Sequence, residues 1–214
     1  AMLVLNRIFN SNWKWAGERG SCQMPEQEFW EDIREAVPEL ILIAEAYWDL
    51  EWDLQRLGFD YVYDKRLYDR LQNASPYDIY LHLKADIMYQ SRLVRFIENH
   101  DEPRSAVVFE GNKLFASAVL FSTLPGMKLY HNGQIEGRKI KIPVQLRRIK
   151  EETPDERISR FYSRLLSIIR HDVFSNGEWE LKEVISGGDT SYRNLIAYVW
   201  RLDNHLRLVA VNLD

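Results

Sequence analysis

The chain has 214 residues, of which 46% are apolar, and 28 Lys and Arg against 32 Asp and Glu give a formal net charge of −4. This size allows one sizeable core, or one core and a small second domain. The acidic balance offers no basic face for a phosphate backbone, the single cysteine excludes an internal disulfide, and no apolar run approaches the roughly 20 residues that span a bilayer. We therefore expect no nucleic-acid partner and no membrane partner.

The first two thirds of the chain alternate between helical and strand patterns. Residues 26–37 carry apolar side chains at helical spacing, and after Pro38 the apolar run 40–44 is typical of a short buried parallel strand that ends at Glu45. Pro76 begins a second helical pattern, and Asn112 is predicted to cap a third over 113–124. Further strands are predicted over 59–64, 92–97 and 126–131. This alternation favours a parallel sheet built from β-α units.

The pattern changes after about residue 150. One more amphipathic helix is marked by apolar residues between Ile158 and Ile169. Three strand patterns follow, over 178–184, 194–202 and 206–213, and the residues 203–205 predict a hairpin turn between the last two. We therefore predict an α/β domain over residues 1–172 and the start of a small antiparallel β domain over residues 173–214.

Two carboxylates follow directly on predicted strands. Glu45 comes after the run 40–44, and Asp101 comes after the strand 92–97 in the segment "FIENHDEPR". In parallel sheets and barrels the ligand site lies at the carboxyl ends of the strands, so both are candidates for catalysis at one mouth. The alternative is that Glu45 and Asp101 are helix caps or loop residues bonded to backbone amides.

Other side chains near these carboxylates leave further alternatives open. His100 beside Asp101 could be a metal ligand, although the other four histidines show neither HxH nor HExxH spacing. Tyr47, Trp48 and Trp52 are interpreted as core and loop packing, with a stacking platform as the alternative. The acidic residues Asp49, Glu51 and Asp53 are predicted to form the solvated start of a helix.

The ordered set of motifs resembles a known family. "LILIAEAYWDLEWDLQRLGFDYVYDKRLYDRL", then "RLVRFIENHDEPR", then "STLPGMKLYHNGQIEG" resembles the second half of an α-amylase-type enzyme of glycoside hydrolase family 13. The resemblance implies a partial (β/α)8 TIM barrel, strands five to eight, followed by part of the C-terminal antiparallel β domain. It also implies that the parent protein is a retaining α-glucan hydrolase acting on α-glucans or maltooligosaccharides.

The resemblance assigns roles to individual residues. It implies that Glu45 is the general acid and base, that Asp101 stabilises the transition state, and that His100, Asn99 and Tyr47 bind substrate. A retaining glycosidase needs a protonated carboxylic acid at the leaving oxygen and an ionised carboxylate as nucleophile. No cofactor and no catalytic metal are implied, and a structural calcium site would involve the missing N-terminal half.

One motif of the family has no counterpart here. The nucleophile of the family is an Asp in a Gly-x-Arg-x-Asp context, and no such segment occurs in these 214 residues. We therefore expect a fragment that is inactive alone, that self-associates through exposed half-barrel edges, and that is cytoplasmic unless a signal peptide precedes it. The alternatives are an inactive carbohydrate-binding or scaffolding remnant, an α-glucan transglycosylase, and a metal-dependent hydrolase using His100 and Asp101.

Overall fold

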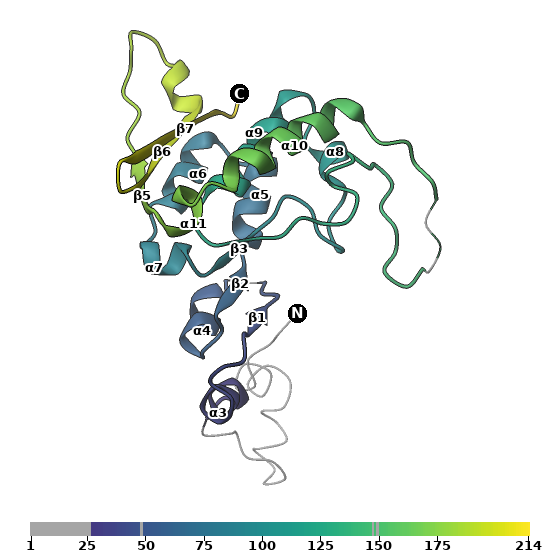
Figure 1. Ribbon diagram of the computed structural model, residues 1–214, viewed down its shortest axis with the longest axis vertical. Helices are drawn as coiled ribbons and strands as arrows, with labels where there is room; N and C mark the ends of the chain where they lie inside the picture. Colours follow the sequence, from purple (N-terminus) through teal and green to yellow (C-terminus); the bar gives the residue numbers. More distant parts are fainter. Residues whose placement is uncertain (1–26, 48, 147, 149) are drawn as a thin grey trace.

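The structure is a computed structural model that describes residues 27–214 with the exception of 48, 147 and 149 (Figure 1). The expectations about the opening segment, about Cys22 and about Trp48 lie outside the described residues. The described chain forms a four-stranded sheet and a three-stranded sheet, with helices between and beside them.

The first sheet is parallel throughout, as the alternation of helix and strand patterns predicts. Its four strands pair in sequence order, so each strand lies beside the next one along the chain. The apolar run 40–44 contributes only two residues to the sheet, because the Leu42 amide donates to the Asp60 side chain at 2.8 Å and not to a neighbouring strand. The expectation that this run is buried is wrong for Leu40, Ile41 and Ile43, which are exposed. The strands are β1 (Ile43–Ala44), β2 (Tyr61–Tyr63), β3 (Leu93–Arg95) and β4 (Met127–Lys128).

Local capping chemistry fixes several helix starts. Asp64 caps the helix after β2 by accepting a hydrogen bond from the Leu67 amide at 3.1 Å, and Ser75 and Asp78 form a capping box before the next helix. The helical pattern after Pro76 is interrupted, because Asp86 caps a new short helix. The helices of this part are α3 (Phe29–Ala36), α4 (Glu51–Arg56), α5 (Lys65–Asn73), α6 (Pro76–Leu83), α7 (Ile87–Gln90), α8 (Ser105–Val108) and α9 (Asn112–Thr123).

Two of the sequence expectations about this part are wrong in detail. Gly111, and not Asn112, is the N-cap of α9, and its φ of 58° needs a residue without a Cβ penalty. Glu51 does not belong to a solvated helix start, because it is only 3% exposed. Burial raises the pKa of the Glu51 carboxyl, against the opposing effect of its backbone hydrogen bond and of Arg66.

The C-terminal part is antiparallel, as its sequence pattern predicts. Figure 1 shows its three strands beside α6 and α11, with the C-terminus near β7. The turn between the last two strands contains Asp203 with a φ of 50°. The elements are α10 (Glu156–Ile169), α11 (Val173–Asn176), β5 (Glu178–Lys182), the 3-10 helix η2 (Ser191–Asn194), β6 (Leu195–Leu202) and β7 (His205–Asn212).

One apolar cluster extends from the parallel part into the antiparallel sheet. It contains Leu120 and Phe121 of α9 together with Tyr198 and Trp200 of β6, all buried. Hydrogen bonds reinforce this contact: the Thr123 Oγ1 lies 2.6 Å from the Tyr198 hydroxyl, and the Trp200 indole donates to the Thr123 carbonyl at 2.7 Å. The second sheet is therefore docked on the C-terminal end of α9. The domain boundary at 172/173 stays a prediction.

A buried polar cluster lies on the helix side of β2 and β3. The wholly buried guanidinium of Arg95 donates to the Asp64 carboxylate and to Gln90 Oε1, and the His82 Nε2 lies 3.0 Å from Asp64 Oδ2. Such a pair is costly to break, because removing one partner leaves an uncompensated charge in the interior.

None of the helices described in this structure has the length and apolar character needed to cross a bilayer.

Candidate functional site

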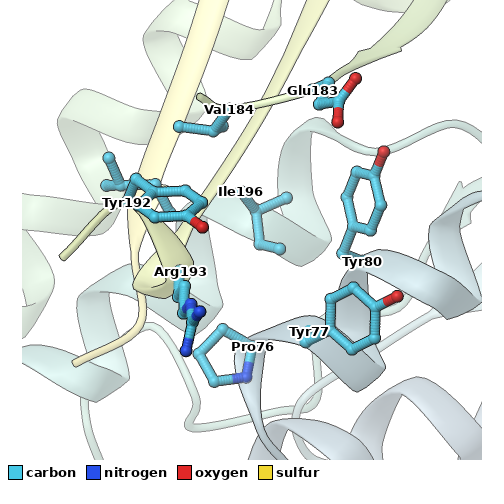
Figure 2. A pocket seen from close by; sticks show the side chains of 9 residues that line it. Pro76, Tyr77, Tyr80, Glu183, Val184, Tyr192, Arg193 and Ile196 are labelled. Atoms are coloured by element: carbon cyan, nitrogen blue, oxygen red, sulfur yellow. The ribbon is translucent and has the colours of Figure 1, made fainter. Parts of the chain in front are cut away.

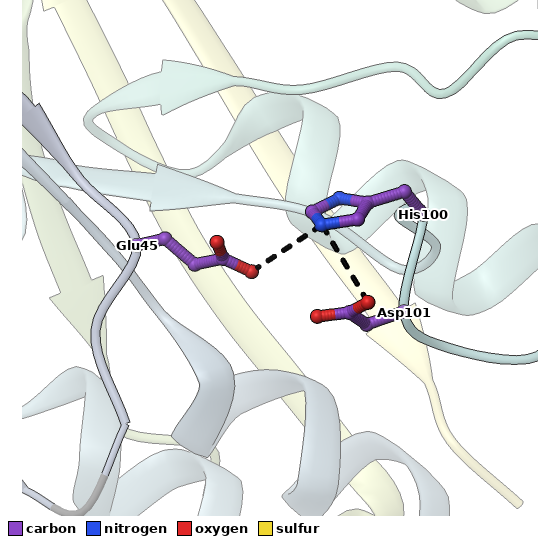
Figure 3. A group of neighbouring side chains, drawn as sticks. All are labelled: Glu45, His100 and Asp101. Carbon is purple, nitrogen blue, oxygen red and sulfur yellow. Dashed lines mark ion pairs between the residues drawn. The ribbon is translucent and has the colours of Figure 1, made fainter. Parts of the chain in front are cut away.

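Glu45 and the segment after β3 meet at one end of the parallel sheet. Glu45 follows β1 directly, and His100 and Asp101 follow β3, so the parallel arrangement brings them to the same end (Figure 3). His100 Nε2 lies 3.7 Å from Glu45 Oε1 and 3.5 Å from Asp101 Oδ1. The expectation that these three residues share one mouth is therefore correct, and neither carboxylate is the N-cap of a described helix.

Tyr47 joins the two carboxylates. Its hydroxyl lies 2.8 Å from Glu45 Oε1 and 3.3 Å from Asp101 Oδ2, so it can donate its proton to either. Burial raises the pKa of Tyr47 far above its ordinary value, and the hydrogen bond and negative charge of Glu45 add to this effect. The phenol therefore stays protonated and acts as a hydrogen-bond donor, not merely as packing.

The turn after β3 is held by Asn99. Its side-chain Oδ1 accepts hydrogen bonds from the Asp101 amide at 2.9 Å and from the Glu102 amide at 2.8 Å. Asn99 is buried, and its Nδ2 has no hydrogen-bond partner among the described residues. An Asn at this position thus fixes the backbone that carries His100 and Asp101.

A buried ion pair closes the base of the same turn. The Arg104 guanidinium donates to Glu98 Oε1, and Ser105 donates to Glu98 Oε2 through its amide at 2.8 Å and its hydroxyl at 2.7 Å. Arg104 also donates to the Asn132 carbonyl at 2.7 Å, which ties the turn to the segment after β4. Glu98 and Arg104 are almost wholly buried. We define residues 98–104 with these contacts as the anchored turn.

Sequence reasoning missed part of this anchor. Glu98 was not singled out, although a charged residue inside the apolar run "VRFIEN" is an unusual buried group and therefore a signal. His131 was also missed; its Nδ1 lies 3.2 Å from Glu98 Oε1. Its role depends on a contact between two segments far apart in sequence, which no local pattern reveals.

A small pocket opens beside the anchored turn. It has a volume of about 260 Å³, and the Lys141 ammonium at its edge donates to the Asp101 carbonyl. Its walls mix polar side chains of the turn with apolar side chains of the segment after β4. They include Asn99, His100, Glu102, His131, Ile142 and Val144. The pocket shares Asn99 and His100 with the candidate site, whereas Glu45, Tyr47 and Asp101 do not line it.

The group of three side chains could also hold a cation. One ligand atom from each of Glu45, His100 and Asp101 lies within 4.8 Å of the others. Two carboxylates and an imidazole are a donor set that zinc accepts in proteins. The geometry is therefore compatible with two chemistries, acid-base work by paired carboxylates and coordination of a metal ion.

No family model matches the chain, and no curated protein matches it either. Solved structures do match. They include the noncanonic maltogenic α-amylase AmyB of Thermotoga neapolitana, with 28% identity, a TM-score of 0.68, and coverage of 86% of this chain and 45% of that chain.

Two more distant structures show the same fold. The cyclic α-maltosyl-(1→6)-maltose hydrolase of Arthrobacter globiformis has 16% identity and a TM-score of 0.67, and covers 86% of this chain and 45% of its own. The debranching enzyme of Nostoc punctiforme has 16% identity and a TM-score of 0.67, with coverage of 89% and 45%. This chain thus spans about half the length of the structures it matches.

These similarities confirm the resemblance to α-amylase-type enzymes. The four parallel strands match part of a TIM barrel of that type, and the antiparallel sheet matches the small β domain that follows the barrel. The roles of individual side chains are not settled by a shared fold.

Proposed function

We propose that this chain, with its α-amylase-type fold, is part of a retaining α-glucan hydrolase, with Glu45 as the general acid and base and Asp101 as the carboxylate that stabilises the transition state. The observation that carries the proposal is the convergence of Glu45, Tyr47, His100 and Asp101 at the carboxyl ends of two barrel strands. In barrels this is the end at which substrates react.

The chemistry that each group would perform follows from its contacts. Glu45 would donate a proton to the glycosidic oxygen and later remove one from water, as the acid and base of a retaining enzyme do. Asp101 would bind sugar hydroxyls through its carboxylate, more strongly as positive charge develops on the ring. Tyr47 would orient the carboxylate to which its single phenolic proton is donated, which at the shorter distance is that of Glu45.

The nucleophile would come from outside these residues. The chain has no Gly-x-Arg-x-Asp segment, and the cluster of acidic and imidazole groups at this site, among the described residues, consists of Glu45, His100 and Asp101. Without a third carboxylate no glycosyl-enzyme can form. We therefore propose that the 214-residue chain is catalytically silent alone and that its site is completed by another segment of the parent protein.

A metal-dependent hydrolase is the second candidate, because the three ligand atoms within 4.8 Å of one another suit a cation. The two candidates differ in their response to a chelator. A carboxylate glycosidase keeps its rate in excess EDTA, whereas a metal hydrolase loses its rate and regains it when Zn²⁺ is added back.

A transglycosylase differs from a hydrolase in its products, which are longer oligosaccharides.

The test compares maltoheptaose turnover by the complete protein with that of two variants. Asp101→Asn removes the charge at the site, and we expect kcat/KM to fall by about 10²–10³-fold. Asp69→Asn is the matched control, because Asp69 is exposed and its carboxylate pairs, within the described residues, with Lys65 alone. Equal activity in the Asp101 and Asp69 variants would contradict the proposal, as would activity that depends on Zn²⁺.

A further inference from the structure

A second cavity is formed by residues other than those of the candidate site. This groove, which we name the tyrosine groove, has a volume of about 560 Å³ and shares no lining residue with the anchored turn (Figure 2). Its volume falls within the range of roughly 300–1,000 Å³ that is typical of small-molecule sites. It lies between α6 and the segments around η2 and β6, and is lined by Pro76, Tyr77, Tyr80, Glu183, Val184, Tyr192, Arg193, Leu195 and Ile196.

Two tyrosine rings form a flat wall on the α6 side. The rings of Tyr77 and Tyr80 are stacked, with centroids 6.2 Å apart and an interplanar angle of 23°. Tyr77 is 62% exposed. Covering such a large ring with another apolar surface would be energetically favourable. Figure 2 shows Tyr192 on the opposite side of the groove, so a ligand between them would meet aromatic side chains on both sides.

The groove also offers hydrogen-bonding groups of both kinds. The hydroxyls of the tyrosines, the Glu183 carboxylate and the Arg193 guanidinium lie at it. Within the described part of the chain, the Arg193 guanidinium contacts the neighbouring Tyr192 ring at 5.9 Å, and neither it nor the Glu183 carboxylate takes part in a side-chain hydrogen bond or an ion pair. One acidic and one basic group leave the groove without a net charge, which suits a neutral ligand better than a phosphate or a carboxylate.

We propose that the tyrosine groove is a second carbohydrate-binding site, which binds a segment of α-linked glucan and holds the polymer while the candidate site acts on it. A pyranose ring has apolar C–H faces that fit a tyrosine wall and a rim of hydroxyls that pair with donors and acceptors of both kinds. The choice of an α-glucan rests on the proposed function. The groove itself requires only a neutral ligand with flat apolar faces and hydroxyl edges.

The test measures binding and not turnover, so that it is independent of the proposed function. The 214-residue chain carrying Glu45→Ala and Asp101→Ala lacks both carboxylates of the candidate site, and its binding of maltoheptaose is measured by calorimetry. We expect Tyr77→Ala in this background to weaken binding by roughly tenfold, since one stacking face is removed. Tyr77→Phe should retain most of the affinity, because the ring remains.

Phe29→Ala is the matched control, because Phe29 is an aromatic residue of another helix that is 47% exposed and does not line the groove. Unchanged binding in the Tyr77→Ala chain, or a loss of the same size in the Phe29→Ala chain, would overturn the proposal. Equal affinity for cellohexaose, whose linkages are β, would overturn the assignment to α-glucan. If maltoheptaose is hydrolysed by the complete protein but does not bind this chain, the groove proposal fails and the proposed function stands.

Discussion

The buried Glu98 carboxylate accepts a hydrogen bond from the Arg104 guanidinium across the turn that carries Asn99, His100 and Asp101. The pair joins the two ends of the turn in the interior, while His100 and Asp101 between them lie beside Glu45. The backbone that carries Asp101 is therefore tied to a buried ion pair that lies outside the group of Glu45, His100 and Asp101.

Arg104→Met should strongly destabilise the chain, because it leaves Glu98 charged and buried. We expect a loss of about 3–5 kcal/mol in the free energy of unfolding, measured by urea denaturation. Lys182→Met is the control, since the ion pair of Lys182 with Glu180 is largely exposed and should contribute only about 0–1 kcal/mol. Similar losses in the two variants would show that the anchored turn is not held by this pair.

The Asp64 cluster should make stability depend on acid pH. Burial alone would raise the pKa of Asp64, but the charges of His82 and Arg95 hold it well below its usual range. A carboxyl whose pKa is lower in the folded chain than in the unfolded chain stabilises the fold. This stabilisation is fully present above the pKa in the unfolded chain, about 3.9, and is lost as pH falls below that value.

Urea unfolding between pH 6 and pH 2.5 checks this expectation. The free energy of unfolding of the native chain should fall more steeply below about pH 4 than that of Asp64→Asn, which is less stable at pH 6 and lacks the titrating group. If the free energy of unfolding changed with pH in the same way for both chains, the ionised Asp64 carboxylate would not be stabilised by His82 and Arg95.

Gly126 should not tolerate a side chain. It has a φ of 96°, and a Cβ there would lie 2.3 Å from the Leu93 carbonyl oxygen, on the strand that pairs with β4. Gly126→Ala should therefore cost about 2–4 kcal/mol through backbone strain and the clash. The comparison uses thermal and urea unfolding of the 214-residue chain.

Substitutions at two other glycines separate the effect of backbone strain from the effect of the clash. A Cβ at Gly111 or Gly187 meets no atom within 4 Å, and only Gly111 has a positive φ. Gly111→Ala should therefore show conformational strain of roughly 1–2 kcal/mol, and Gly187→Ala should lie within about 0.5 kcal/mol of the native chain. A Gly126→Ala chain no less stable than Gly111→Ala would indicate that the sheet relaxes around the methyl group.

Among the described strands, β1 has a neighbour on one side only, and we expect its other edge to promote self-association. Ile43 of β1 and Ile41 just before it are 47% and 66% exposed, and an apolar edge strand is a template for pairing with another chain. The double variant Ile41→Lys/Ile43→Lys should shift the chain toward monomer in sedimentation velocity. Ile185→Lys is the control, because Ile185 is 80% exposed but lies outside the parallel sheet. Association that is equal in both variants would place the contact elsewhere.

Local sequence patterns predicted a parallel sheet and the meeting of Glu45 with Asp101, because alternating helix and strand patterns indicate β-α units and the carboxyl ends of parallel strands share one edge. They did not predict the hydrogen bonds of Glu98 and His131, or the tyrosine groove. These depend on side chains brought together from distant segments, such as Tyr77 and Tyr192. The burial of Glu51 was missed for the same reason, since only packing shows that its face of α4 is covered.

The most direct measurement of the role of Glu45 compares two substrates of the complete protein. Glu45→Gln should reduce kcat/KM by about 10²–10⁴-fold for maltoheptaose, whose sugar leaving group needs a proton, and far less for an α-maltosyl fluoride, whose leaving group does not. Glu110→Gln, at an exposed position outside the candidate site, should leave both rates unchanged. Equal losses on the two substrates in the Glu45→Gln protein would contradict the assignment of Glu45 as the general acid.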